Sequence, residues 1–432
     1  MEKLKSFVVS VLNRAVAKYI KRNNIKVVAV AGSIGKTSTV SAIRTMLGQH
    51  YRVHQPKTAY NTNKSVHLEM FDLQFATSFF GWARVSLKIL LKARGKADYE
   101  VLVVEIGTDH PGELQTFAWL KPEICVLTAV APEHMEYFKT IEAVAKEEFS
   151  VTTFSKRLVA NKNSIPPELV PDDLADDTVW YGAGETYRAA YYTPEGLSVD
   201  AGVQADFTFD AIQLFKVPLR VLGQHSLDAL TAAGAVGVLC DLSREEIARG
   251  LQEFEPVKGR MQPLHGIQDS FIIDDSYNAS PKAAIAALGV LYGLQAPQRI
   301  ALLGNMNEMG DYSAQAHREV GAYCDPDRLD LVVTIGKDAN EFLAAAAQGR
   351  GCTVKTFESP YEAGAYIAAQ LKPKAAILVK GSQNGVFAEE AIKSFLADPA
   401  DEARLVRQSE YWMDIKRDQF PSGGSGAMPA PS

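Results

Sequence analysis

A β-branched apolar run and a glycine-bearing loop follow one another in Val27-Val28-Ala29-Val30-Ala31-Gly32-Ser33-Ile34-Gly35-Lys36-Thr37-Ser38. The next segment is compatible with a helix, and a strand, a glycine loop and a helix in this order are typical of a phosphate-binding loop. Backbone N–H groups and the helix N-terminus attract phosphate oxygens, Lys36 adds a positive charge, and Thr37 offers its hydroxyl to Mg²⁺. The general pattern has a further glycine where Val30 stands, so the strand and the helix carry the prediction. We expect nucleotide phosphates to contact Gly32, Ser33, Ile34, Gly35, Lys36, Thr37 and Ser38.

The composition is that of an ordinary soluble globular protein, with 47% hydrophobic and 22% charged residues. A chain of 432 residues is long enough for two or three domains, each with its own core. The net charge of −6 argues against a general nucleic-acid binder. The four cysteines lie far apart and lack the paired spacing of a metal site, so we expect a reduced, cytoplasmic protein. No apolar run is long enough to span a membrane.

Two segments in the first part of the chain have the pattern of amphipathic helices. In residues 1–24, apolar side chains recur at helical spacing and basic side chains occupy the other faces. No small-residue cleavage site follows, so we do not expect a signal peptide. A second helix of this kind is predicted at Phe79–Leu91. Either both helices pack on the body of the protein, or they attach it loosely to the inner membrane surface, and the sequence leaves both alternatives open.

The region from 25 to 257 has the pattern of a nucleotide-binding α/β domain. The strand-like runs Val27–Ala31, Val101–Ile106 and Ile124–Val130 alternate with helical patterns, which predicts a parallel sheet covered by helices. From about Leu158 to Val221, short alternating segments suggest antiparallel strands. Helical patterns return at Ser226–Cys240 and Arg244–Gln252.

A second α/β alternation follows a domain boundary near residues 256–259, and we expect a C-terminal Rossmann-like domain over residues 258–420. Its predicted strands are Phe271–Asp274, Arg299–Leu303, Leu331–Ile335 and Ala376–Val379. Between them, helices are predicted at, for example, Pro281–Leu291 and Tyr361–Leu371. Residues 421–432 are rich in Gly, Ser, Pro and Ala, and we expect them to be disordered.

Three candidate site residues follow strands of the first domain. Glu105 ends the run from Val101, and ligands of open α/β sheets lie beyond the carboxyl ends of the strands, so Glu105 is expected near the phosphate loop as a Mg²⁺ ligand. The alternative for Glu105 is that its carboxylate faces solvent and binds no metal. His134 follows the strand from Ile124 and is a candidate metal ligand or proton carrier. On charge alone, Lys146-Glu147-Glu148 is expected to be a solvated part of a helix.

Polar residues also mark the turns of the later chain. Ser226 is expected to cap the helix that follows it. Arg260 lies at the domain junction, where an arginine can clamp phosphate. Asp274 and Asp275 end a strand before a helix that begins at Pro281, and we expect both acids to face a cleft between domains.

Taken in order, these motifs resemble the Mur ligase family, from about Ile25 to Phe395. The motifs that carry the resemblance are the phosphate loop, Asn61-Thr62-Asn63, Glu105-Ile106-Gly107, Glu133-His134, Gly223 with His225, Gly259-Arg260-Met261, Asp274-Asp275-Ser276-Tyr277-Asn278-Ala279, Leu303-Gly304-Asn305-Met306 with Glu308, and Lys380-Gly381-Ser382. The run from Asp274 to Ala279 is most similar to the branch that adds D-alanyl-D-alanine to a UDP-N-acetylmuramoyl tripeptide.

The resemblance implies ATP and Mg²⁺ as cofactors and assigns roles to residues. Lys146 matches a lysine that the family carbamylates, which would place its carbamate with His134 on a second Mg²⁺. The implied site residues are Lys36, His134 and Lys146 for catalysis, Thr37, Glu105, His134 and Lys146 for metal, Arg260 and Asp275 for the nucleotide, and Asn61, Thr62, Asn63, Tyr277 and Asn278 for the substrate.

Three departures from the family pattern affect the prediction. Only some 25 residues precede the first strand, where this branch usually has a domain for the UDP-sugar, so we expect that domain to be missing. Ser226 and Ala229 stand where the family has asparagines, and the second of these normally contacts adenine. The segment after Asn61-Thr62-Asn63 lacks the usual Gly-x-Pro.

The expected activity is that of an ATP-dependent amide ligase acting through an acyl phosphate. The expected partners are a UDP-linked peptide precursor and an amino acid or dipeptide, without nucleic acid, and we expect a monomer. One alternative is a related ligase with another carboxylate substrate, such as a folylpolyglutamate-type enzyme. Another is a non-catalytic nucleotide-binding scaffold at the membrane, which amine-dependent ADP release would distinguish from either ligase.

Overall fold

The computed structural model describes residues 2–56, 63–74, 78–192, 203–307, 309–383 and 385–421, without the side chains of residues 2–6, 63–65, 79 and 225. The chain forms two compact units. The first unit comprises Met1–Ala190, Ala205–Val217 and Leu227–Phe254. The second comprises Tyr191–Gln204, Pro218–Ser226 and Glu255–Ser432. Several expected features lie outside the described residues: Asn61, Thr62, Glu308 and the tail from residue 422.

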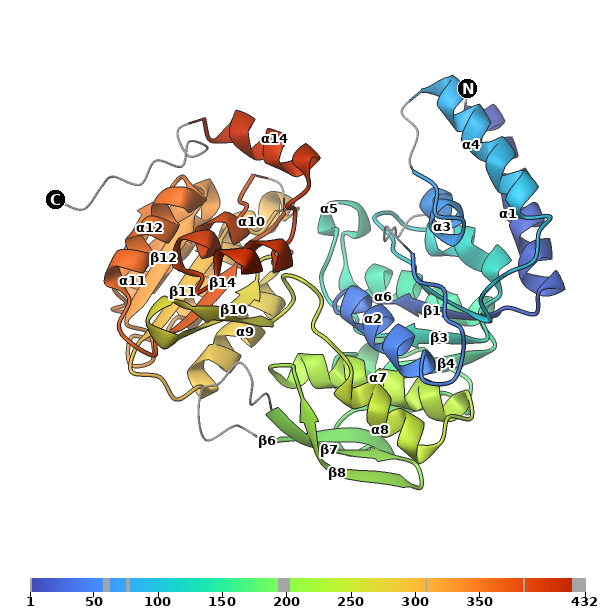
Figure 1. The fold of residues 1–432 in the computed structure, drawn as a ribbon, viewed down its shortest axis with the longest axis horizontal. Helices are drawn as coiled ribbons and strands as arrows, with labels where there is room; N and C mark the ends of the chain where they lie inside the picture. The colour runs from blue at the N-terminus through green and yellow to red at the C-terminus, as the bar shows by residue number, and fades with distance from the viewer. Residues whose placement is uncertain are drawn as a thin grey trace. The chain divides into compact units, whose positions relative to one another are not determined.

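The sheet of the first unit has eight strands in the order β2-β1-β3-β4-β5-β6-β7-β8 (Figure 1). Its strands are β1 (Lys26–Ala31), β2 (Val101–Glu105), β3 (Ile124–Leu127), β4 (Arg157–Asn161), β5 (Val179–Tyr181), β6 (Tyr187–Tyr192), β7 (Val203–Phe209) and β8 (Ile212–Leu219). The strand β1 pairs in parallel with both β2 and β3, as the sequence predicts. The carboxyl ends of these three strands therefore meet at one edge of the sheet, which is where a ligand of such a sheet binds.

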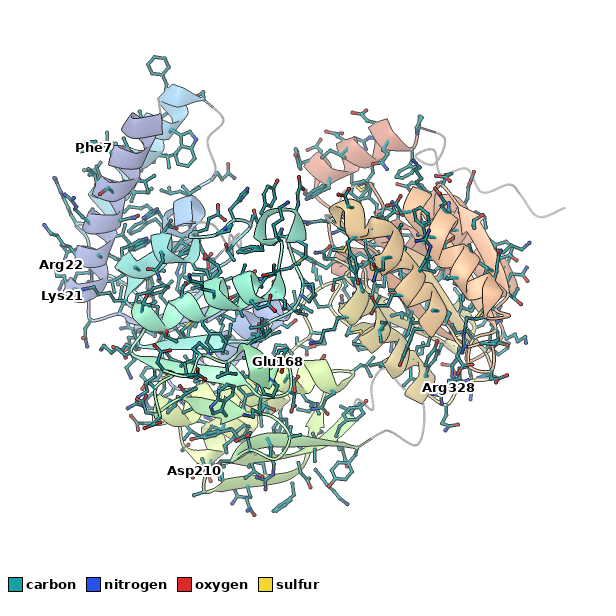
Figure 2. The ribbon with its side chains drawn as sticks, turned by 180° about the vertical axis from the view of Figure 1, so that it is seen from behind. Phe7, Lys21, Arg22, Glu168, Asp210 and Arg328 are labelled. Carbon is teal, nitrogen blue, oxygen red and sulfur yellow. The ribbon has the colours of Figure 1, made fainter. Side chains whose placement is uncertain are left out.

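The prediction of antiparallel strands from about Leu158 is wrong for the first strands of that region. The strand β4 pairs in parallel with β3, β5 with β4, and β6 with β5. Only two residues connect β7 to β8, and so short a link can join only antiparallel strands. Asp210, which Figure 2 labels, belongs to this link. Its φ is 52°, a conformation that Asp adopts more readily than most residues.

The helices of the first unit are α1 (Glu2–Arg22), α2 (Lys36–Leu47), α3 (Asn63–Met70), α4 (Phe79–Lys92), α5 (Met135–Phe138), α6 (Ile141–Phe149), α7 (Gln224–Leu239) and α8 (Arg244–Gln252). The helix α7 begins before Ser226, and the Ser226 hydroxyl donates to the carbonyl of Leu222. The prediction that Ser226 caps this helix is therefore wrong. By contrast, α8 begins with a complete capping box between Ser243 and Glu246.

One hydrophobic core joins α1, α3 and α4 to the face of the sheet that carries Val27, Leu102 and Cys125. Figure 1 shows α1 and α4 side by side, and the guanidinium of Arg22 ties their ends together by donating to the carbonyls of Ala93 and Gly95. These helices are therefore built into the first unit along part of their length.

The second unit has a six-stranded sheet in the order β13-β12-β11-β14-β10-β9. Its strands and helices are β9 (Gln262–Gly266), β10 (Ser270–Asp275), α9 (Pro281–Gly293), β11 (Arg299–Gly304), α10 (Ser313–Tyr323), β12 (Leu331–Ile335), α11 (Ala344–Gly349), β13 (Val354–Phe357), α12 (Pro360–Gln370), β14 (Ala376–Lys380), α13 (Glu389–Ile392) and α14 (Glu410–Gln419). The predicted strands and helices of this region are confirmed to within a few residues. The antiparallel edge strand β9, which pairs with β10, is an addition that the sequence pattern did not indicate.

Candidate active site

The phosphate loop leaves β1 in a conformation that requires glycine. Gly32 has a φ of 117°, and a Cβ built there would lie 2.4 Å from Thr128 Oγ1 and 2.8 Å from the backbone nitrogen of Ala129. Gly35 has a φ of 89° and precedes the first residue of α2. The loop therefore runs close along the end of β3, and only a residue without a side chain fits at Gly32.

Ser33 fastens this loop to the segment that follows β3. Its hydroxyl donates to the carbonyl of Ala131 at 3.1 Å and accepts from the Ala131 N–H at 3.0 Å. Its own N–H donates to the carbonyl of Ala129. These bonds hold the loop in place before any ligand arrives, which is the preorganisation that phosphate binding needs.

Two residues at the start of α2 belong to the candidate site. Lys36 Nζ donates to the carbonyl of Gly32 at 2.5 Å, so the lysine folds back over the loop. Thr37 Oγ1 donates to Glu105 Oε2 at 2.9 Å. Glu105 thus lies beside the phosphate loop and not free in solvent, as the position of β2 next to β1 predicts.

Glu148 and Glu133 also lie at this loop, and the sequence analysis assigned a role to neither. Glu148 on α6 is buried, with 2% of its surface exposed. Its carboxyl group lies close to Glu133, to the backbone of Gly32 and to the charge of Lys36. Burial, and next the charge of Glu133, raise the pKa of Glu148 well above its usual range.

His134 is placed by a left-handed turn, with a φ of 47°, directly before α5. Its Nε2 lies 3.3 Å from Asp109 Oδ1, and its side chain is 22% exposed. Asp109 comes from the segment after β2, so this pair joins the segments that follow two neighbouring strands. Sequence reasoning missed Asp109, which is an exposed loop acid without a distinguishing pattern.

The three charges of Lys146-Glu147-Glu148 have different environments. Lys146 is exposed and makes no hydrogen bond or ion pair with the residues that the structure describes. Glu147 is buried and accepts from the backbone N–H groups of Gly112 and Leu114 at 2.7 and 2.8 Å. The expectation of a solvated run is therefore wrong for both glutamates, because the helix turns them toward the protein.

In the second unit, the acids at the end of β10 are buried and used locally. Asp275 Oδ2 accepts from Lys380 Nζ at 2.6 Å, and Asp275 Oδ1 accepts from the backbone of Met261. Asp274 accepts from the N–H and the hydroxyl of Ser276, and burial raises the pKa of Asp274 to about 7. Both carboxylates are therefore buried and bonded to groups of their own unit, whereas the sequence predicts that they face a cleft between domains.

The other candidates of the second unit cluster around Tyr277. The Cζ atom of Arg260 lies 4.3 Å from the centre of the Tyr277 ring. The carbonyl of Tyr277 accepts from Arg407 at 3.0 Å, and the carbonyl of Asn278 accepts from Lys380 at 2.9 Å. A network of backbone contacts therefore fixes this turn, while the Tyr277 and Asn278 side chains are half-buried.

Some candidate residues have no described geometry. Asn63 begins α3, but its side chain is outside the description, as is that of His225. Within the described ranges, no group of three or more His, Cys, Asp or Glu side chains is arranged to hold a metal ion. In the same ranges, none of the helices has the length and apolar character that crossing a membrane requires.

Comparisons with known proteins agree with this arrangement. The family model "Mur ligase middle domain" matches residues 30–237, and "Mur ligase, glutamate ligase domain" matches residues 259–383. The UDP-N-acetylmuramoyl-tripeptide–D-alanyl-D-alanine ligase of Bacillus subtilis is 27% identical over 399 residues, which cover 90% of this chain and 79% of that protein.

Two solved structures have the same fold. One is MurF from Acinetobacter baumannii, with a TM-score of 0.69 and 22% identity, covering 89% of this chain and 79% of the other. The second is MurF ligase from Thermotoga maritima in complex with ADP, with a TM-score of 0.69 and 20% identity, covering 91% and 84%. The two family models together match well over half of the chain, and the chain belongs to the Mur ligase family.

Proposed function

We propose that this protein is an ATP-dependent ligase that joins D-alanyl-D-alanine to a UDP-N-acetylmuramoyl tripeptide in peptidoglycan synthesis. The observation that carries the proposal is the preformed phosphate loop, with Thr37 bonded to Glu105 beside Lys36. The substrate class is supported by the name of the Bacillus subtilis relative, which is similar along most of both chains.

The reaction proceeds in two steps. A substrate carboxylate attacks the γ-phosphate, which gives an acyl phosphate and ADP, and an amine then attacks the acyl carbon and releases phosphate. Lys36 neutralises charge on the transferred group, and the N–H groups of the loop hold the other phosphates. The protein's main contribution is to position two reactants whose negative charges repel.

Residues of the first unit fit a Mg²⁺ ion. The Thr37 hydroxyl and the Glu105 carboxylate are oxygen donors that already lie within hydrogen-bond distance of each other. Mg²⁺, when bound, supplies positive charge that offsets the charge of the phosphates. Thr37 and Glu105 would hold that ion beside the loop.

Arg260 is the residue of the second unit that we propose for the nucleotide. One nitrogen of its guanidinium, Nε, is buried and has no hydrogen-bond partner among the described residues. Asp275 is a weaker candidate, because Lys380 and Met261 already engage both of its oxygens. Tyr277 and Asn278, together with Asn61, Thr62 and Asn63, remain proposed contacts of the substrate.

A phosphate-release assay tests the proposed reaction. UDP-N-acetylmuramoyl tripeptide with D-alanyl-D-alanine should release phosphate only when both are present, and mass spectrometry should detect the amide product. Release with glutamate and a folate instead supports the alternative ligase. ATP binding without amine-dependent release supports a scaffold and contradicts the proposal.

Because the side chain of Ala229 cannot form a hydrogen bond with adenine, we expect the preference for ATP over GTP to be only about tenfold.

We further propose that the α1–α4 pair contacts an anionic membrane surface. The helix α4 buries Ile89 in the core but exposes Leu87 and Leu91, at 57% and 55%, on its other side. Phe7 on α1 is 66% exposed (Figure 2). These side chains are accompanied by basic residues that are exposed: Arg14, Lys18, Lys21, Arg84 and Lys88. An apolar face with surrounding cations suits the boundary between lipid headgroups and acyl chains.

Point substitutions test the membrane contact better than deletion, because removing α4 would expose the core around Ile89. Leu87→Glu combined with Leu91→Glu should abolish sedimentation with vesicles of anionic lipid while leaving phosphate release unchanged. Phe215→Glu, at a position on β8 that is 67% exposed, is the matched control and should bind as the wild type does. Equal binding by all three proteins would contradict the proposal.

A cytoplasmic location and a monomeric state complete the proposal. The location is supported by the cysteines, all four of which are free and buried thiols. Sedimentation equilibrium of the purified chain should give the mass of one copy.

A further inference from the structure

The register of α6 decides which of its charged residues faces the phosphate loop. Val144, Ala145, Glu148 and Phe149 are buried and lie at helical spacing along one side. Lys146 lies off this stripe and is exposed. The helix therefore directs Glu148, and not Lys146, into the first unit.

Glu148 differs from its neighbour Glu147 in how its carboxylate oxygens are bonded. Glu147 is also buried, but both of its oxygens accept hydrogen bonds from the loop of residues 108–114. In contrast, Oε2 of Glu148 and Oε1 of Glu133 are buried and have no hydrogen-bond partner in the part of the chain that the structure describes. An unsatisfied buried carboxylate oxygen costs stability, so this arrangement is expected where a ligand supplies the missing contact.

The position of the two acids indicates the chemistry of that ligand. Glu148 lies close to the backbone of Gly32 and to Lys36, so the pair lies beside the loop that we propose for the phosphates. Anionic phosphates repel carboxylates unless a cation lies between them. Mg²⁺ is commonly held by one or two carboxylates together with substrate phosphates and water.

We propose that Glu148, assisted by Glu133, holds a divalent cation against the transferred phosphate, and that Lys146 takes no part in this site. This proposal rests on nucleotide binding at the phosphate loop. The position is distinct from that of Thr37 and Glu105, because β1 lies between β2, which ends at Glu105, and β3, which precedes Glu133. Because Glu148 is itself a carboxylate, the site requires no carbamate and no bicarbonate.

Mn²⁺ binding in the presence of a non-hydrolysable ATP analogue tests the proposal. Electron paramagnetic resonance of free Mn²⁺ gives the affinity without reference to turnover. Glu148→Gln keeps the shape of the side chain and should weaken Mn²⁺ binding by about tenfold or more, since losing even a hydrogen-bond partner of a metal ligand costs about 10–100-fold in affinity. Lys146→Gln, two residues away on the exposed side, is the matched control and should bind Mn²⁺ within about twofold of the wild type.

Two further measurements keep the outcome decisive. Glu133→Gln should also weaken Mn²⁺ binding, and it replaces Glu148→Gln if the latter does not fold. The ¹³C spectrum of wild-type protein in labelled bicarbonate should show no carbamate signal from the protein.

Different results overturn different statements. Unchanged Mn²⁺ affinity in Glu148→Gln with normal nucleotide binding, or a carbamate signal that Lys146→Gln abolishes, overturns the assignment alone. Failure of the wild type to bind the nucleotide overturns the proposed function and this assignment with it.

Discussion

At the scale of the residue, Lys36 is the charge on which the proposed reaction depends most. Its amino group folds over the loop and contacts the carbonyl of Gly32, so it does not contribute to the apolar core. Lys36→Ala should therefore lower phosphate release by about a hundredfold or more, the typical cost of removing a group that stabilises developing charge. Circular dichroism should show an unchanged fold. Near-normal turnover in the folded variant would contradict the phosphate-loop assignment.

Asp274 gives a pH-dependent prediction at the same scale. Burial raises the pKa of Asp274 from the ordinary 3.8 to about 7. Between these values the unfolded chain releases a proton that the folded chain retains, so the free energy of unfolding falls as the pH rises. Asp274→Asn removes this effect while an amide oxygen still accepts from Ser276. The variant should gain more in Tm over the wild type at pH 8 than at pH 4. An equal difference at both pH values would show that Asp274 ionises normally.

At the scale of the element, the turn between β1 and α2 requires the absence of a side chain at Gly32. A Cβ there would clash with Thr128 Oγ1 at 2.4 Å, and the substituted residue would also have to adopt a positive φ. Gly112 has a φ of 88°, and no described atom lies within 4 Å of a Cβ built there. A substitution at Gly112 therefore meets only the positive φ, which makes it the matched control. Gly32→Ala should lower both Tm and nucleotide affinity, while Gly112→Ala should lower Tm slightly. Similar effects from both would show that the loop tolerates movement away from β3.

At the scale of the whole molecule, the charge is unevenly distributed. The chain carries a net charge of −6, yet the charged residues of α1 and α4 are mainly basic. Vesicle binding through these helices should therefore fall as salt is raised from about 0.05 to 0.5 M, because the Debye length shortens to a few ångströms. Nucleotide binding within the preformed loop should change less. Salt-independent vesicle binding would show that the apolar residues act alone.

The sequence predicted most of what depends on local pattern. The run from Val27 to Ser38 predicts a strand, a glycine turn and a helix, because β-branched residues favour strands and glycine permits the positive φ of the turn. The strands at Val101 and Ile124 and the second alternation were predicted for the same reason. The neighbouring positions of Glu105 and Thr37 followed from the rule that parallel strands end at one edge.

The tertiary structure decided what depends on facing and pairing. Short strands such as β4 and β5 pair in parallel although their pattern suggested otherwise, since pairing depends on distant segments. The burial of Asp275 could not be predicted from the sequence, because its partner Lys380 lies far along the chain. The burial of Glu148 could almost have been predicted, since Glu148 lies on the same side of the helix as the apolar residues Val144 and Ala145. The sequence Lys146-Glu147-Glu148 alone gave no reason to choose Glu148 over Lys146 as a site residue. Only the packing of the helix, which buries Glu148 and exposes Lys146, distinguishes them.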